Sequence, residues 1–257
     1  MSAGSAGMRH ALVTGGGQGI GEATVRALRA LGMNVTLLGR RLPVLQAVVD
    51  TDPAHLHAVA ADVADPTQVA LAVAAAHERF GPVQVLVNNA GQALSAPFHK
   101  MDMALWRQML DVNLTGTMVC TQAVLPDMLA AGWGRVVNVA STAGQVGYAY
   151  VSAYCAAKHG VVGLTRSLAL ELAAKGITVN AVCPGYTETD IVRESIDRVV
   201  AKTGRTHEQA LAVFVKSNPQ GRLVQPEQVA DAIAWLCGEG AAAVTGQSIS
   251  VSGGEVM

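Results

Sequence analysis

Short segments rich in β-branched residues alternate with longer segments of helical periodicity along almost the whole chain. Strands are predicted over residues 10–14, 34–38, 55–61, 83–89, 135–141, 177–184 and 247–252. These segments do not alternate strictly between apolar and polar residues, which is typical of parallel strands covered on both faces. The pattern predicts an α/β fold, a doubly wound Rossmann-type domain with a seven-stranded parallel sheet and helices on both faces.

Helices are expected between these strands, over residues 19–31, 43–50, 66–79, 102–131, 152–174 and 226–237. Pro126 should kink or divide the fourth of them. No linker rich in proline, serine or charge interrupts the chain, so residues 8–257 should form one Rossmann-type domain behind a flexible tail at residues 1–7. The segment at about 186–218 is too long and too polar for a simple connection, and we interpret it as a lid over a ligand.

The composition excludes several classes of function. Hydrophobic residues make up 51% of the 257 residues and charged residues 14%, which is typical of a globular protein. A net charge of −1 predicts no surface for nucleic acid or anionic membrane, and no apolar run reaches the ~20 residues of a membrane helix. The first residues lack the features of a signal peptide, so a cytoplasmic location is expected. Four widely spaced cysteines and scattered histidines predict buried thiols and no metal site.

A glycine-rich turn, TGGGQGIG at residues 14–21, follows the first predicted strand and opens the first helix. Glycines allow the backbone to approach a pyrophosphate closely, and the helix N-terminus offers N–H groups and a positive dipole end. The same glycines could serve turn geometry alone, but their position in a doubly wound pattern favours dinucleotide binding. The predicted cofactor contacts in this turn are Gly15, Gly17, Gln18, Gly19 and Ile20.

The end of the second predicted strand, LLGRR, bears on which dinucleotide is bound. NAD enzymes use an acidic side chain here for the ribose 2′-hydroxyl, whereas arginine suits the 2′-phosphate of NADP. Gly39 stands where the carboxylate would be expected, and Arg40 and Arg41 follow it. NADP(H) is therefore favoured, with NAD(H) as the alternative. The two arginines could also be ordinary solvated surface residues.

Tyr154 and Lys158 are four residues apart in the helix predicted over residues 152–174, so they share one face. A free phenol has a pKa of ~10, which is too high for ready proton exchange near neutrality. A nearby ammonium should lower the pKa of Tyr154 and make it an effective general acid or base. Ser141 follows the carboxyl end of a predicted strand, where its hydroxyl could hold the same substrate oxygen. Taken singly, the Tyr–Lys pair could be a helix surface and Ser141 a turn cap.

Six motifs occur in order: TGGGQGIG (14–21), NNAG (88–91), the asparagine of DVNLTG (111–116), Ser141, Tyr154-x-x-x-Lys158 and PG (184–185). Together they resemble the short-chain dehydrogenase/reductase family, over essentially the whole chain from about Met8. The segments GITVNAVCPG, GRLVQPEQVA and GAAAVTGQSISVSGG are most similar to 3-oxoacyl-thioester reductases and aromatic polyketide ketoreductases. The resemblance implies a catalytic set of Asn113, Ser141, Tyr154 and Lys158. In that set Lys158 also contacts the nicotinamide ribose, and Asn113 holds a water that relays protons.

The resemblance also implies cofactor contacts beyond the glycine turn. Asp62 and Val63, after the third strand, would contact the adenine, while Asn89 and Gly91 would flank the riboses. The residues expected near the nicotinamide amide are Pro184, Gly185, Thr187 and Thr189. Both threonines could make the contact with the amide.

The predicted lid carries the basic residues Arg193, Arg198, Lys202, Arg205 and Lys216. A basic lid could meet the phosphates of coenzyme A or phosphopantetheine. The alternative is a solvated helix, balanced by Glu188, Asp190, Glu194, Asp197 and Glu208. Small and apolar residues at 93–97 and 145–150 are expected to line the substrate pocket.

The resemblance implies an oxidoreductase that transfers a hydride between NADPH and a ketone or secondary alcohol. A small 3-oxoacyl thioester or polyketide-like ketone is expected, linked to coenzyme A or to a carrier protein. One alternative is an NAD-dependent 3-hydroxyacyl-CoA or secondary-alcohol dehydrogenase, against which the Gly39-Arg40-Arg41 sequence counts. Another is a non-catalytic dinucleotide-binding regulator, which would be expected to lack Tyr154 or Lys158. The family is often tetrameric through the Tyr154 helix and the last strand, so a homotetramer is expected.

Overall fold

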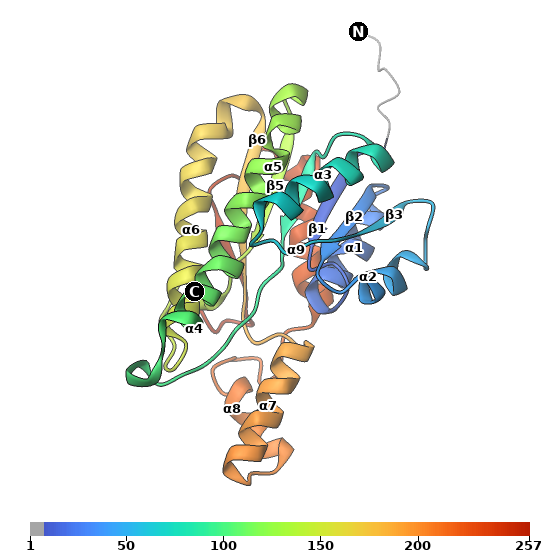
Figure 1. The fold of residues 1–257 in the computed structure, drawn as a ribbon. Coiled ribbons are helices and arrows are strands. Elements are labelled where there is room, and N and C mark those ends of the chain that lie inside the picture. Colours follow the sequence, from blue (N-terminus) through green and yellow to red (C-terminus); the bar gives the residue numbers. More distant parts are fainter. Residues whose placement is uncertain (1–7) are drawn as a thin grey trace.

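The computed structural model describes residues 8–257, so the tail predicted at residues 1–7 lies outside the described residues. Seven parallel strands form one sheet in the order β3-β2-β1-β4-β5-β6-β7, which confirms the predicted architecture (Figure 1). The strands are β1 (His10–Thr14), β2 (Asn34–Gly39), β3 (Leu56–Ala60), β4 (Val85–Asn88), β5 (Gly134–Val139), β6 (Ile177–Pro184) and β7 (Ser248–Val251). The strand order reverses direction between β1 and β4, and such a switch point is where doubly wound folds bind ligands.

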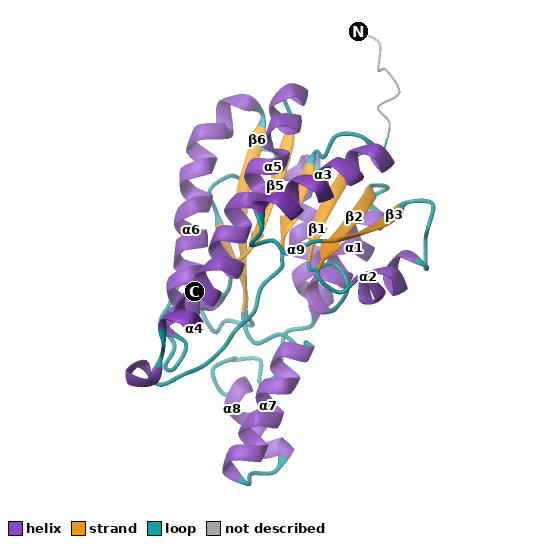
Figure 2. Cartoon of the chain, in the orientation of Figure 1, coloured by secondary structure: helices purple, strands orange, loops and turns teal. Residues whose placement is uncertain are grey.

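Helices cover both faces of the sheet (Figure 2). In residues 8–257 they are α1 (Gly19–Ala30), α2 (Leu42–Val49), α3 (Pro66–Phe80), α4 (Met103–Leu110), α5 (Gly116–Ala131), α6 (Ser152–Leu172), α7 (Asp190–Thr203), α8 (His207–Val215) and α9 (Pro226–Cys237). One apolar core joins α1, α2 and α9 to the sheet, and a second joins α3, α5 and α6 to its other face. Within the described residues, no helix combines the length and apolar character needed to span a membrane.

Strand β1 shows why the strands read as continuous apolar runs. Ala11 and Val13 pack into the core beneath α1, α2 and α9, while Leu12 packs into the opposite core. All five residues of β1 are buried. Since both faces are covered, both sets of alternating side chains must be compatible with burial.

The helical region predicted over residues 102–131 is not divided at Pro126, so the expectation of a break there is wrong. Helix α5 continues through Pro126 and ends at Gly132, whose φ is 60°. The irregularity lies earlier, in a π-helical turn over Asp111–Thr115. This turn contains Asn113, whose side chain bonds to a distant loop, and π-turns often occur at functional sites. The sequence gives no local signal for such a turn, because its cause is a tertiary contact.

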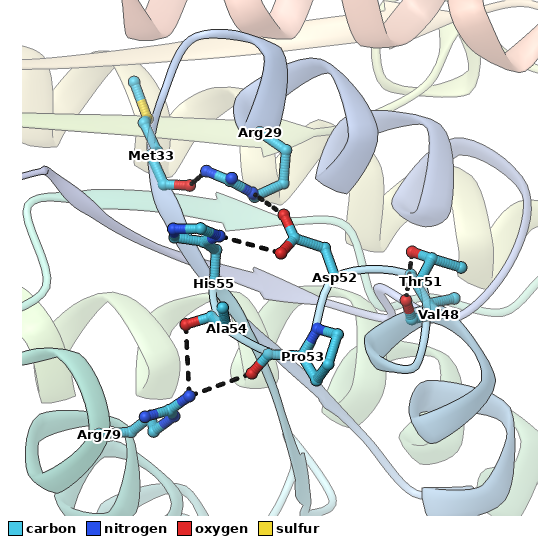
Figure 3. Close-up of polar contacts among 9 residues, drawn as sticks. All are labelled: Arg29, Met33, Val48, Thr51, Asp52, Pro53, Ala54, His55 and Arg79. Carbon is cyan, nitrogen blue, oxygen red and sulfur yellow. Dashed lines mark hydrogen bonds and ion pairs between the residues drawn. The ribbon is translucent and has the colours of Figure 1, made fainter.

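Polar contacts hold the connection between α2 and β3 (Figure 3). The Asp52 carboxylate accepts hydrogen bonds from His55 Nδ1 and Arg29 Nε, both at 2.9 Å, and these bonds lower the pKa of Asp52. Arg79 Nη2 donates to the carbonyl of Pro53 at 3.0 Å and to that of Ala54 at 3.3 Å. These contacts fix the entry into β3, the strand that leads to one end of the site described below.

The segment predicted as a lid forms helices α7 and α8, which project beyond the sheet (Figure 1). A small apolar cluster of Val192, Ile196 and Ala210 joins the two helices. Thr206 begins α8 with a capping box, in which its hydroxyl accepts from the N–H of Gln209. The predicted lid segment is therefore a helical hairpin with a core of its own.

Candidate active site

A cavity of about 780 Å³ lies along the carboxyl ends of the strands and reaches from the glycine turn to the lid. Every residue predicted from the sequence to act in catalysis or cofactor binding lines this one cavity. These residues come from the loops after β1 to β6, from the π-turn and from α6, which are far apart in the sequence. The fold thus brings the predicted residues together at the switch point, in a volume suited to a small-molecule site.

The glycine turn leaves the N-terminus of α1 open to the cavity. Gly15 and Gly19 have φ values of 66° and 54°, which side chains other than glycine rarely adopt. A Cβ on Gly19 would lie 3.1 Å from Thr189 Cγ2, so a larger residue would crowd the cavity wall. The N-cap residue Gln18 makes no capping hydrogen bond through its side chain. The N–H groups of the first turn are therefore uncapped by a side chain, and the residues present fit a dinucleotide pyrophosphate.

Two arginines lie beside this turn. Arg41 Nη2 donates to Gln18 Oε1, which holds the guanidinium near the glycine turn. Arg40 also lines the cavity, and both arginines are exposed. Among the cavity residues that the structure describes, Asp62 alone is acidic, and its carboxylate accepts from the N–H of Ala64 at 3.0 Å. The charge at the end of β2 is therefore positive, as a 2′-phosphate requires.

Helix α6 places Tyr154 and Lys158 beside Ser141. Lys158 Nζ lies 5.7 Å from the centre of the Tyr154 ring and donates to the carbonyl of Val139 at 2.7 Å. Val139 ends β5, and Ser141 follows two residues later. The Ser141 oxygen accepts from the N–H of Ala143 at 3.1 Å, so Ser141 does act as a turn cap. Its own hydroxyl proton stays available for a ligand oxygen.

Burial sets the ionisation of both α6 side chains. It raises the pKa of Tyr154 to about 12, an effect that the Ser141 hydroxyl partly opposes. It also lowers the pKa of Lys158 to about 8. The expectation that Lys158 brings the pKa of Tyr154 below 10 is thus wrong for the chain by itself, because the four-residue spacing does not reveal burial. The phenol is protonated at neutral pH, which is the state of a proton donor.

Asn113 is fully buried and joins the π-turn to the loop after β4. Its Nδ2 donates to the carbonyls of Gln92 at 3.0 Å and Met109 at 2.9 Å, and its Oδ1 accepts from the N–H of Gln92 at 3.3 Å. A Cβ on Gly91 would lie 2.8 Å from Asn113 Oδ1 and 3.7 Å from Lys158 Nζ. The side chain therefore positions the backbone next to Lys158, and its role with a relay water stays a prediction.

The loops after β3, β4 and β6 supply the remaining predicted contacts. Asn89 Nδ2 donates to the carbonyls of Thr14 and Gly15, which ties the NNAG loop to the glycine turn. The Thr187 hydroxyl donates to the carbonyl of Gly185 at 3.0 Å, while Thr189 precedes α7 with its methyl group near Gly19. Val63, Pro184, Gly185 and both threonines line the cavity. The two threonines therefore both remain candidates for the amide contact.

The substrate end of the cavity is only partly as predicted. All of residues 93–97 line the cavity, but of residues 145–150 only 148–150 do. Gln145 instead accepts from the Ser250 hydroxyl near β7. The Tyr148 hydroxyl is hydrogen-bonded to the Thr142 hydroxyl at 2.9 Å and to the Glu255 carboxylate at 2.8 Å. Sequence reasoning missed Glu255, and no motif marks it, because its partner is 107 residues away.

Comparisons with known proteins bear on this site. The family model described as short chain dehydrogenase matches residues 9–199. The acetoacetyl-CoA reductase of Rhizobium meliloti (strain 1021) is 38% identical over 249 residues, covering 96% of this chain and 98% of its own. The D-beta-hydroxybutyrate dehydrogenase of the same organism is 37% identical over 252 residues, with coverages of 96% and 98%. A crystal structure of an actinorhodin polyketide ketoreductase variant with NADPH superposes with a TM-score of 0.93 and 40% identity, covering 96% of this chain and 97% of that one.

Proposed function

The chain belongs to the short chain dehydrogenase family, and we propose that it is an NADPH-dependent reductase of 3-oxoacyl thioesters or polyketide-like ketones. The observation that carries this proposal is one cavity, which joins the glycine turn and its two arginines to Tyr154, Lys158 and Ser141. Relatives named for a ketone reductase and for a hydroxyacid dehydrogenase catalyse the two directions of the same chemistry. The protonated phenol of Tyr154 is the form that can give a proton to a carbonyl oxygen, as reduction requires.

Side chains of α6 and of the loop after β5 supply the proton and bind the carbonyl oxygen. When bound, the reduced nicotinamide supplies the hydride that adds to the carbonyl carbon. Tyr154 donates its phenolic proton to the carbonyl oxygen, so the product is the secondary alcohol. Ser141 donates a hydrogen bond to the same oxygen and stabilises the negative charge that develops there. Lys158 stabilises the phenolate that remains, and it would also hold the ribose hydroxyls of the bound cofactor.

We assign NADP(H) rather than NAD(H) on the residues at the end of β2. Arg41 is held over the glycine turn by Gln18, and Arg40 lines the same part of the cavity. Gly39 has no carboxylate to accept from a ribose 2′-hydroxyl. An NAD-dependent dehydrogenase is the second candidate, supported by the similarity to D-beta-hydroxybutyrate dehydrogenase. The two arginines favour the first candidate, because they would gain no charged partner from NAD at this position.

Residues 8–257 are proposed to act as a single catalytic domain that assembles as a homotetramer. Strands from both ends of the chain share one sheet, which supports the single domain. Leu170 on α6 is 86% exposed, and β7 is an edge strand, so an apolar side chain and a strand edge are both accessible for association. Two different self-complementary interfaces generate a tetramer. Light scattering on the purified protein should give the mass of four chains, and a monomeric mass would contradict the proposal.

The cytoplasm is the proposed location. The four cysteines, Cys120, Cys155, Cys183 and Cys237, are all free and buried. Free thiols persist in reducing compartments, which supports this assignment. Cell fractionation followed by detection of the chain tests it, and recovery from an oxidising compartment would contradict it.

A substrate panel tests the proposed reaction. Acetoacetyl-CoA, simple aryl ketones and the corresponding alcohols are assayed with NADPH, NADH and the oxidised cofactors. The proposal predicts that the highest kcat/KM belongs to a 3-oxoacyl thioester with NADPH. Preference for an alcohol with NAD would instead support the second candidate. Cofactor binding without turnover of any compound would indicate a regulator.

A further inference from the structure

Helix α7 of the lid turns one particular face toward the cavity. Ile191, Ser195, Arg198 and Lys202 line the cavity, and their spacing of four, three and four residues places them along one side of the helix. Arg198 Nη2 donates to the Ser195 hydroxyl at 3.0 Å, so its guanidinium lies along that side. Two cations therefore face the space that a substrate would enter.

Charge on α7 is sorted between the cavity side and the outer side. The three acidic residues of the helix, Asp190, Glu194 and Asp197, do not line the cavity. Arg193, the third basic residue, contacts Asp190 at 3.3 Å and Glu188 at 3.5 Å instead. The alternative considered for this segment is a solvated amphipathic helix. Such a helix would not require its acidic and basic side chains to lie on different sides. The cavity side of α7 is positive because both of its charged residues are basic.

The position of these cations along the helix limits what they can bind. Counted from Ile191, Arg198 and Lys202 lie about 10 and 16 Å along the α7 axis, at 1.5 Å per residue. They therefore lie well away from the strand ends where Ser141 and Tyr154 meet the carbonyl group. A group bound by them must be anionic and must be separated from that carbonyl by a long spacer. No acidic lining residue described for the lid competes with such a group.

We propose that Arg198 and Lys202 bind a phosphate of the pantetheine-type carrier to which the 3-oxoacyl group is attached. This inference rests on the proposed ketoreductase function. It deepens that function, because a phosphate contact would favour thioesters that carry a phosphate over ketone substrates that carry none. A phosphate next to the pantetheine arm is common to coenzyme A and to carrier proteins, and the nucleotide phosphates belong to coenzyme A alone. Arginine and lysine are the side chains suited to either phosphate.

The test compares three thioesters of the same acyl group at saturating NADPH. Acetoacetyl-CoA carries the pantetheine phosphate and the nucleotide phosphates, acetoacetyl-phosphopantetheine carries the pantetheine phosphate alone, and acetoacetyl-N-acetylcysteamine carries no phosphate. The double variant Arg198→Ala/Lys202→Ala is compared with wild type and with the control Arg193→Ala, which changes the same helix on its outer side. We expect the double variant to lose about tenfold in kcat/KM for acetoacetyl-CoA, through KM, because two charge-assisted contacts are removed. It should change less than twofold with the neutral thioester, and the control should change less than twofold with all three.

The outcomes separate this inference from the function on which it rests. An equal loss on the neutral thioester, or no loss on acetoacetyl-CoA, would overturn the phosphate contact while leaving the reductase intact. A loss on both phosphate-bearing substrates supports binding of the pantetheine phosphate, and a loss on acetoacetyl-CoA alone supports binding of the nucleotide phosphates. If wild type reduces none of the three, the proposed function itself fails. Calorimetric titration of coenzyme A into the NADP-bound protein gives a second readout, with a Kd about tenfold weaker expected in the double variant.

Discussion

Lys158 Nζ lies 5.7 Å from the centre of the Tyr154 ring while it donates to the carbonyl of Val139 at 2.7 Å. The carbonyl at the end of β5 thus fixes the ammonium group beside the phenol. Burial acts on both groups, raising the pKa of Tyr154 to about 12 and lowering that of Lys158 to about 8. Near pH 7 the pair is a neutral phenol beside an ammonium, which is the arrangement required to protonate a carbonyl oxygen.

The pH dependence of cofactor use should report Lys158. Its pKa lies below the usual lysine value, so its charge is present below about pH 8 and is lost as pH rises through 8. Since kcat/KM for NADPH reports groups of the free enzyme, this ratio should fall above about pH 8. In Lys158→Arg the guanidinium stays charged, so the fall should disappear from whatever activity remains. A wild-type profile that is flat to pH 9.5 would contradict this role.

Removing both arginines at the end of β2 should separate the two cofactors. Arg40→Ala/Arg41→Ala should raise KM for NADPH roughly 10- to 100-fold, because charge-assisted contacts to the 2′-phosphate are lost. KM for NADH should change less than threefold. Arg26→Ala is the control, since Arg26 is exposed on α1 and pairs with Glu22 outside this cavity. Equal changes with both cofactors would remove the argument for the 2′-phosphate.

Asn113 should act on both stability and turnover. Asn113→Ala leaves the part-buried N–H and carbonyl of Gln92 and the buried carbonyl of Met109 without their side-chain partner, so the free energy of unfolding should fall by ~1–3 kcal/mol. The Gly91 backbone beside Lys158 should also lose its fixed position, lowering kcat. Denaturant unfolding and steady-state kinetics measure the two effects. Asn113→Asp is the comparison, since it keeps the acceptor but loses the donor to Gln92 and Met109. Unchanged stability in Asn113→Ala would show that these hydrogen bonds do not hold the loop.

Local patterns were sufficient to predict most of the fold. The predicted strands, and the helices predicted outside residues 102–131, fall where the β-branched and helical segments indicate, with ends that differ by one or two residues. Helices α7 and α8 were not predicted as helices. The glycine turn and the Tyr154–Lys158 pair carry their chemistry in a short stretch of sequence, so the parallel sheet brings them to the same edge. The predicted cofactor residues that follow β2, β3 and β6 line the same cavity for the same reason.

The features that were missed depend on contacts between distant segments. The π-turn around Asn113 forms where a buried side chain bonds to the Gln92 backbone, 21 residues earlier. The raised pKa of Tyr154 follows from desolvation of the phenol in the cavity wall, which the spacing to Lys158 does not encode. The two lid cations could be found in the sequence, but their orientation toward the cavity required the packing of α7.

The central claim is that Tyr154 donates the proton to the ketone. Tyr154→Phe removes only the hydroxyl, and Tyr150→Phe makes the same change at another tyrosine that lines the cavity. The decisive measurement is NADPH oxidation by acetoacetyl-CoA, together with NADPH binding by fluorescence, in both variants. Tyr154→Phe should lower kcat by about 10²–10⁴-fold while its Kd for NADPH stays within threefold, and Tyr150→Phe should keep most of the activity. A Tyr154→Phe protein that retains more than a tenth of the wild-type kcat would contradict the account.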